Sequence, residues 1–432
     1  MKYYSTNQSV PEVSFQDAIF NGLPEDNGLY MPESIERLPA EFFNNIDNLS
    51  LPEIGYQVAK QFIGNEIDED SLKHIVSETL NFDIPLVEVE QNVYSLELFH
   101  GPTLAFKDIG ARFLARCLAY FSDQTQKKST ILVATSGDTG GAVAHGFLGV
   151  ENIKVVILYP KGKVSEIQEK QLTTLGQNIS TLEVDGTFDD CQALVKQSFL
   201  DKELKAKYAL TSANSINIAR LIPQSFYYFW AYKQLKNKNK PMVVSVPSGN
   251  YGNITAGLFA KKMGLPIAKF IASTNVNDII PKFLKSGEFN PKASIETISN
   301  AMDVGNPSNF YRLFELYNKD LTSISKELKG VSFDDETTKG TMLEVYKRTN
   351  YELDPHGAVG YLGLKSLLKT ETEQGVFFET AHPAKFIEVV EEVLDKKVDI
   401  PERLAVCMTK EKQATSISNS FDDLVDYIYA NL

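Results

Sequence analysis

The chain has 432 residues, of which 43% are hydrophobic and 23% charged, as in ordinary globular proteins. This length allows two or three domains with a large core. The formal net charge of −13 argues against a nucleic-acid partner or an anionic membrane surface, because both would favour a basic face. An anionic substrate would therefore need a local basic pocket.

The cysteines and the start of the chain indicate the compartment. Cys117, Cys191 and Cys407 are odd in number and too far apart for a disulfide scaffold or a zinc site. The first residues lack the apolar core of a signal peptide, and no apolar run approaches a membrane span. We therefore expect a cytoplasmic protein with no membrane partner and no metal.

Alternating strands and helices indicate an α/β fold in the middle of the chain. Residues 1–92 carry helical periodicity broken by prolines, which predicts an N-terminal, mostly helical domain. Further on, alternation predicts parallel sheets covered by helices on both faces. We divide the rest into a large domain, 93–125 with 210–432, and a small α/β domain, 126–209, and regard the polar stretch 290–350 as an insertion. The expected strands are Thr130–Ala134, Val155–Tyr159, Ile179–Val184, Met242–Val246 and Ala268–Ala272, and the expected helices are Gly140–Gly149, Gln168–Leu175, Asp189–Leu200 and Ile254–Met263.

Lys107 is a candidate reactive amine. It follows the apolar residues Leu104, Ala105 and Phe106, just before a helical pattern. Burial disfavours the ammonium form and lowers a lysine pKa, as a lysine that binds an aldehyde requires. The alternative is a surface lysine that forms an ion pair with Asp108.

Glycine-rich turns follow two of the expected strands. In the turn 248–253, Gly249 and Gly252 would let the backbone approach a phosphate, and Asn250 and Asn253 could donate side-chain N–H groups. A desolvated lysine together with such a phosphate turn suits an enzyme that holds pyridoxal phosphate covalently. The turn 135–141 offers hydroxyls and N–H groups to a carboxylate or phosphate, or is a plain helix cap.

Two further segments carry polar candidates. Residues 212–220 place small polar groups before a helix and one arginine, Arg220, in it, although Ser215 and Asn217 could simply cap that helix. Lys163 is either a phosphate ligand or a solvated lysine. Thr380 follows an apolar strand and could cap a helix or offer its hydroxyl to the pyridine nitrogen of the cofactor. His100, His356 and His382 lack metal-site spacing and are interpreted as local hydrogen-bonding residues.

Together these segments resemble the threonine synthase family, in its longer bacterial and fungal type. The resemblance covers most of the chain, from Leu98–Gly110 through Val244–Gly264 to Thr380–Phe386. It implies the fold type II architecture of pyridoxal-phosphate enzymes, shared with tryptophan synthase β and serine dehydratase. It also implies conversion of O-phospho-L-homoserine and water to L-threonine and phosphate.

The resemblance implies a role for each candidate residue. Lys107 would be the catalytic lysine that binds the cofactor aldehyde. The remaining cofactor-binding residues would be Gly249, Asn250, Tyr251, Gly252, Asn253 and Thr380. The substrate-binding residues would be Ser136, Asp138, Thr139, Lys163, Ser215, Asn217 and Arg220.

Two other functions remain open from the sequence. A dehydratase of the same fold that acts on serine or threonine would need no pocket for a substrate phosphate. A non-catalytic protein that binds phosphoamino acids could have kept the fold, although the intact Lys107 argues against it.

Overall fold

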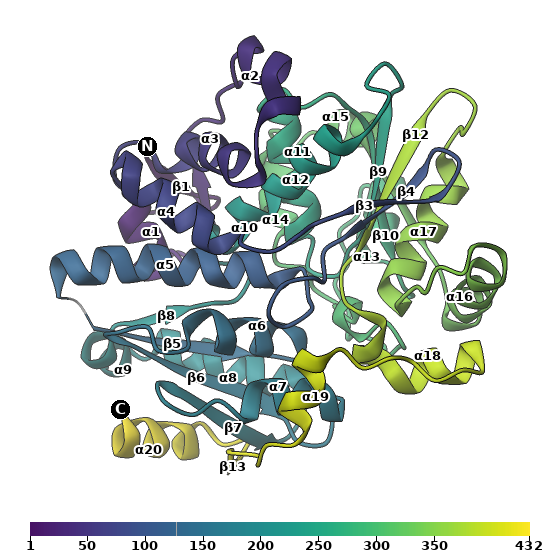
Figure 1. The fold of residues 1–432 in the computed structure, drawn as a ribbon. Coiled ribbons are helices and arrows are strands. Elements are labelled where there is room, and N and C mark those ends of the chain that lie inside the picture. Colours follow the sequence, from purple (N-terminus) through teal and green to yellow (C-terminus); the bar gives the residue numbers. More distant parts are fainter. Residues whose placement is uncertain (127) are drawn as a thin grey trace.

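Two β-sheets with helices packed around them organise the computed structural model, which describes residues 1–126 and 128–432 (Figure 1). The predicted α/β class is confirmed. Across these residues, no helix combines the length and apolar character that a bilayer span requires.

The larger sheet has, in the described residues, six strands in the order β11-β10-β9-β12-β4-β3. All neighbouring strands are parallel except β3 and β4, which pair antiparallel. The carboxyl ends of β9 and β12 therefore lie side by side, and the turns after them begin at Ser248 and Thr380. The strands are β3 (Leu86–Glu90), β4 (Val93–Glu97), β9 (Met242–Pro247), β10 (Ile267–Thr274), β11 (Leu328–Ser332) and β12 (Gln374–Glu379).

The second sheet has, over the same residues, five parallel strands in the order β13-β7-β6-β5-β8. Every strand and helix predicted between 130 and 272 is found, with ends that differ by at most two residues. The strands are β5 (Ser129–Ala134), β6 (Ile153–Pro160), β7 (Ile179–Asp185), β8 (Leu210–Ser212) and β13 (Thr415–Ser418). Around them lie α6 (Asp138–Phe147), α7 (Glu166–Thr173), α8 (Phe188–Leu200), α9 (Lys202–Tyr208) and α20 (Phe421–Asn431).

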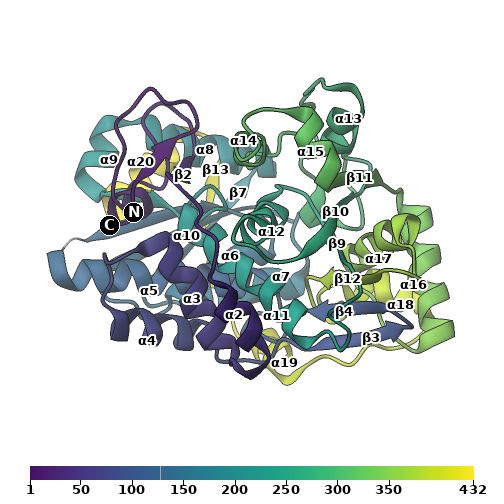
Figure 2. The same ribbon diagram turned by 90° about the horizontal axis from the view of Figure 1, so that it is seen from above.

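The N-terminal region is mostly helical, as predicted. The Ser50 side chain accepts from the Glu53 N–H and the Glu53 side chain accepts from the Ser50 N–H, so this reciprocal cap fixes the start of α3. Figure 2 shows α3 and α4 beside α5 and α11. The elements are β1 (Tyr3–Ser5), α1 (Phe15–Asn21), β2 (Tyr30–Pro32), α2 (Ala40–Asn45), η1 (Ile46–Asn48), α3 (Leu51–Ile63) and α4 (Glu69–Thr79).

Of the remaining helices, α5 lies between the two sheets, α19 lies against α7 beside the second sheet, and most of the others lie around the larger sheet (Figure 1). These remaining helices are α5 (Lys107–Thr125), α10 (Ile218–Leu221), η2 (Ile222–Ser225), α11 (Phe226–Gln234), α12 (Gly252–Lys262), α13 (Ile279–Ser286), η3 (Asn300–Met302), α14 (Phe310–Glu315), α15 (Leu321–Glu327), α16 (Asp335–Thr349), α17 (Pro355–Leu367), η4 (Pro383–Phe386), α18 (Ile387–Leu394) and α19 (Glu402–Met408).

The strand pairing bears on the proposed domain division. β3 lies within residues 1–92 but pairs with β4 of the larger sheet. β8 and β13 lie outside 126–209 but pair with strands of the second sheet. The division into 1–92, 93–125 with 210–432, and 126–209 therefore stays a proposal, to which we add β8 and β13 as members of the second sheet.

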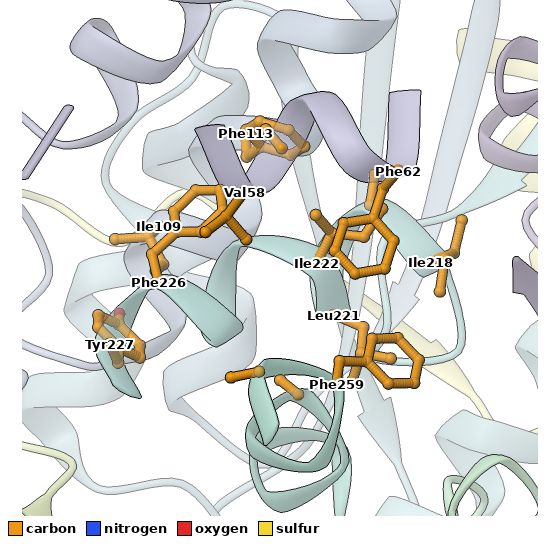
Figure 3. Close-up of a cluster of buried hydrophobic side chains, with 14 of the residues drawn as sticks. Val58, Phe62, Ile109, Phe113, Ile218, Leu221, Ile222, Phe226, Tyr227 and Phe259 are labelled. Atoms are coloured by element: carbon orange, nitrogen blue, oxygen red, sulfur yellow. The ribbon is translucent and has the colours of Figure 1, made fainter. Parts of the chain in front are cut away.

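A buried hydrophobic cluster fixes α5 against its neighbours, between the two sheets (Figures 1 and 3). Phe113 of α5 meets Phe226 edge to face, with 6.1 Å between ring centroids, and Phe62 of α3 stacks on Phe259 of α12 at 5.6 Å. These side chains are fully buried. Since α5 begins at Lys107 and the adjoining α10 contains Arg220, this cluster holds two of the predicted site residues in place.

We predict that Phe226→Ala lowers the free energy of unfolding by about 3–5 kcal/mol, because it leaves a cavity among close-packed rings. Urea denaturation followed by tryptophan fluorescence measures this change. The matched control is Ile400→Ala, which truncates a side chain that is 43% exposed and should change stability little. Equal losses in both variants would contradict the assignment of this cluster as the core.

Candidate active site

A cavity of about 360 Å³ opens at the carboxyl ends of β9, β12 and β5. Ligands of open α/β sheets collect at this position. The predicted site residues that line it are Lys107, Ser136, Thr139, Ser215, Arg220, Gly249, Asn250, Tyr251, Gly252, Asn253 and Thr380.

Lys107, the first residue of α5, presents a free amine to the cavity. Its Nζ makes no hydrogen bond or ion pair with the described residues. It lies over the Phe106 ring, 5.7 Å from the ring centroid. Burial lowers its pKa from 10.5 to about 8; the nearby charge of Asp138 opposes this, and those of Lys385 and Arg220 add to it. A substantial fraction of this amine is thus neutral and nucleophilic at physiological pH.

The turn after β9 presents backbone N–H groups to the same cavity. Tyr251 is left-handed, with φ of 61°, and α12 begins at Gly252. The N–H groups of Gly252 and Asn253 donate no hydrogen bond to the rest of the described chain. Two free N–H groups at a helix start form a site for a phosphate.

Gly249, rather than Gly252, is the crowded glycine of this turn. A Cβ on Gly249 would lie 2.6 Å from the Ala301 carbonyl oxygen and 2.7 Å from the Met302 Cα. The corresponding nearest atom for Gly252 is 3.3 Å away, at Asn309 Nδ2, and Gly252 has no left-handed φ. The close approach that requires glycine is therefore made by the segment 300–302.

The asparagine side chains of this turn fix its shape. Asn250 Nδ2 donates to Ser215 Oγ at 2.6 Å, and its Oδ1 accepts from the Ser308 N–H at 2.6 Å. Asn253 Nδ2 donates to the Pro247 carbonyl at 2.7 Å. Since both amide groups are engaged within the protein, the backbone N–H groups are what remains for a phosphate.

Arg220 is a buried cation without a carboxylate partner in the described residues. It is 3% exposed, its Nη1 donates to the Ala213 carbonyl, and its buried Nε has no partner. Burial lowers its pKa to about 10, so it stays charged at neutral pH. Gly110 makes room for it, since a Cβ there would lie 3.0 Å from Arg220 Nε. A guanidinium that has no carboxylate partner and lies at a cavity wall suits an oxyanion.

The turn before α6 also lines the cavity. Gly137, with φ of 141°, precedes α6, and Thr135 Oγ1 accepts from the N–H groups of Gly137 and Gly140 at 3.0 and 2.8 Å. Thr135 thus satisfies N–H groups at the start of this helix. Ser136 and Thr139 face the cavity.

Three predicted substrate ligands lie outside the cavity lining. Asp138 forms an ion pair with Lys385 Nζ at 2.5 Å; burial opposes its ionisation, but the charges of Lys385 and Lys107 outweigh this and lower its pKa. Asn217 caps α10, with Oδ1 accepting from the Ala219 N–H at 3.1 Å, as the alternative interpretation held. Lys163 is exposed on the turn after β6.

The 290–350 segment supplies cavity residues that we did not predict. Lys292 lines the cavity, with its Nζ 3.7 Å from Asp278 Oδ1. Residues 300–306 also line it, and Ala301 and Met302 lie against Gly249 of the turn 248–253. His356 holds this segment: Nδ1 donates to Asp354 Oδ1 at 2.7 Å and Nε2 accepts from the Ala301 N–H at 3.1 Å. The family resemblance includes Asn300–Tyr311 of this segment but assigns it no role at the site.

The other two histidines make local hydrogen bonds, as predicted. His100 Nε2 lies 2.8 Å from Glu97 Oε2, and His382 Nδ1 accepts from the Ala384 N–H at 3.1 Å.

Comparisons with known proteins agree with this geometry. Residues 80–379 match the family model described as "Pyridoxal-phosphate dependent enzyme", residues 2–80 match "Threonine synthase N terminus", and residues 357–428 match "Threonine synthase, C-terminal". The threonine synthase of Escherichia coli is 48% identical over 406 residues, which cover 94% of each chain.

The chain belongs to the threonine synthase family.

Solved structures show the same fold. The crystal structure of threonine synthase from Escherichia coli superimposes with a TM-score of 0.94 at 46% identity and covers all of both chains. The structure of PLP-bound threonine synthase from Brucella melitensis gives 0.94 at 36% identity, covering 100% of this chain and 99% of that one. The predicted fold type and the pyridoxal-phosphate cofactor are thereby confirmed.

The residues of the cavity fit this cofactor. Lys107 offers an amine that is partly neutral at physiological pH, and Gly252 and Asn253 offer free N–H groups at a helix start. The Gly249 backbone lies where a Cβ would not fit. The cavity thus has an amine for an aldehyde and a separate place for a phosphate.

We predict that Gly249→Ala weakens cofactor binding by about 1–3 kcal/mol, because the added methyl group overpacks the turn against Ala301. Equilibrium dialysis against pyridoxal phosphate measures this. The matched control is Gly340→Ala in α16, where the added Cβ meets no atom within 4 Å and affinity should not change. Unchanged affinity in Gly249→Ala would remove this turn from the cofactor site.

Proposed function

We propose that the chain converts O-phospho-L-homoserine and water to L-threonine and phosphate. The observation that supports this most is that one cavity contains two separate groups suited to an anion: the free N–H groups at the start of α12, and Arg220, which has no carboxylate partner in the described residues. The first suits the cofactor phosphate. The second is left for a phosphate on the substrate, and the turn 136–139 is available for its carboxylate.

Pyridoxal phosphate, when bound, supplies the electron withdrawal that makes protons next to the substrate nitrogen acidic. Lys107 would hold the cofactor, with Gly249–Asn253 around its phosphate and the Thr380 hydroxyl at its pyridine nitrogen. The Thr380 carbonyl accepts from the Phe106 N–H at 2.9 Å, which places Thr380 beside the residue before Lys107.

Lys107 would move the protons of the reaction. Once substrate has displaced it, its neutral Nζ can take a proton from the α-carbon and then from the β-carbon. Its lowered pKa of about 8 suits an amine that must both accept and return protons.

Arg220 would bind the substrate phosphate, with Ser215 beside it and Lys292 as a second cation in place of Lys163. Ser215 is held by Asn250, and its carbonyl accepts from Arg312 Nη1 at 3.2 Å. A phosphate retained there after it leaves the γ-carbon could assist deprotonation of the water that adds at the β-carbon. The proposal includes a cytoplasmic location, which the three buried, free cysteines support.

Release of inorganic phosphate from O-phospho-L-homoserine, with L-threonine formed in equal amount, tests the proposal. A dehydratase would instead release ammonia from serine or threonine at a higher kcat/KM. A non-catalytic binding protein would show neither reaction. Either result would reject the proposed function.

The neutral amine of Lys107 gives a pH prediction. The rate at which the cofactor-free chain recombines with pyridoxal phosphate should rise with pH and level off above a midpoint near pH 8, because only the unprotonated amine attacks the aldehyde. At pH 7 about a tenth of such amines are neutral, against about 0.03% for an exposed lysine. Stopped-flow absorbance measures the rate, and a midpoint near pH 10 would contradict the burial effect.

We predict that Arg220→Gln lowers kcat/KM for O-phospho-L-homoserine. The loss should correspond to about 2–5 kcal/mol of transition-state binding free energy, as expected when one partner of a buried charge pair is truncated. Cofactor content should stay normal, because we place the cofactor phosphate at the start of α12, away from Arg220. Lys292→Gln should also lower kcat/KM, whereas the matched Lys163→Gln should have no effect, since Lys163 lies outside the cavity. Wild-type kinetics in Arg220→Gln would place the substrate phosphate elsewhere.

A further inference from the structure

A second cavity, of about 580 Å³, lies behind the loop that leads to Lys107. Pro102 of this loop forms part of its wall. The rest comes from the residues that follow α4, from α5 and α6, and from α7 and α19 with the residues that follow each of them. It shares no lining residue with the first cavity.

The second cavity is cationic in an acidic chain. Arg112, Arg403 and Lys410 line it, against the single carboxylate of Glu402. Lys410 Nζ has no hydrogen bond or ion pair within residues 1–126 and 128–432. Burial, with the charges of Lys385 and Lys410, lowers the pKa of the lining His145 to about 4, so His145 is neutral at pH 7. The side chains that line the cavity therefore carry a net positive charge.

Two buried polar atoms in this cavity lack partners. Arg112 Nε is buried and unpaired, while its Nη2 donates to the Glu78 carbonyl and to Asn81 Oδ1. Gln171 is 3% exposed; its Nε2 donates to the Thr103 carbonyl at 3.1 Å, but its Oε1 has no partner. Leaving such groups unsatisfied costs free energy, which a ligand would recover. The cavity thus offers donors to an anion and an acceptor to a hydroxyl or an amine.

We propose that this second cavity binds a small carboxylate that carries a hydroxyl or amino group next to a carboxyl group. The carboxyl groups of this ligand contact Arg112, Arg403 and Lys410, and its hydroxyl or amino group donates to Gln171 Oε1. Arg403 Nη1 donates to the carbonyls of His100 and Gly101 at 3.0 and 3.2 Å, so the anion lies against the loop that precedes Lys107.

Calorimetric titration of the cofactor-loaded enzyme with L-malate tests the site. Malate has no amine that could react with the cofactor, and succinate is the same dicarboxylate without the hydroxyl. We expect one equivalent of malate to bind about fivefold more tightly than succinate, the difference of one hydrogen bond. Lys410→Gln should weaken malate binding about tenfold, as expected for one charge-assisted contact.

Two further variants locate the anion. Lys347→Gln removes an exposed lysine of α16 that lies outside both cavities and should leave the malate Kd unchanged. Arg220→Gln should also leave it unchanged. Absence of malate binding, an unchanged Kd in Lys410→Gln, or loss of binding in Arg220→Gln alone would overturn the proposal. Equal affinities for malate and succinate would overturn the part assigned to Gln171.

Discussion

The buried ammonium of Lys385 joins the segments that meet at the first cavity. Its Nζ pairs with Asp138 Oδ1 at 2.5 Å, at the start of α6, and donates to the Thr103 carbonyl at 2.9 Å, in the loop that leads to Lys107. Lys385 itself follows β12. One cation thus connects both sheets and the loop that precedes Lys107. Since breaking a buried ion pair costs about 3–5 kcal/mol, this contact fixes the geometry on which Lys107 depends.

Arg220 shows the opposite arrangement of a buried cation. Lys385 has a carboxylate partner, whereas Arg220 has only the Ala213 carbonyl and an unpaired Nε. Such a group persists only where the surroundings hold it, and here the space beside Gly110 and the cluster of Figure 3 do so. A polar group that stays unsatisfied in an otherwise well-paired interior is expected at functional sites, because the ligand supplies the missing partner.

Local signals predicted five of the strands, the glycine-rich turns after two of them and Lys107 as an amine with a lowered pKa, because each depends on a few consecutive residues. What escaped prediction depends on distant contacts. Asp138 pairs with Lys385 and does not line the cavity, and Gly249 is crowded by Ala301, which is distant in the sequence. Lys292 reaches the cavity from the same 290–350 segment as Ala301. β13 joins the second sheet from the far end of the chain, which no local pattern indicates.

The charges around Lys107 also connect binding to proton transfer. Besides burial, the positive charges of Lys385 and Arg220 lower its pKa, and Asp138 raises it. Lys385 is already neutralised by Asp138, so Arg220 is the cation whose effect a ligand can change. In the proposed reaction, a phosphate at Arg220 would offset that charge and raise the proton affinity of Lys107. The amine would then be neutral enough to bind the cofactor in the resting enzyme and a stronger base once the phosphorylated substrate is present. An unphosphorylated amino acid would leave Arg220 uncompensated and Lys107 a weaker base, so the same guanidinium would favour the phosphorylated substrate in both binding and proton transfer.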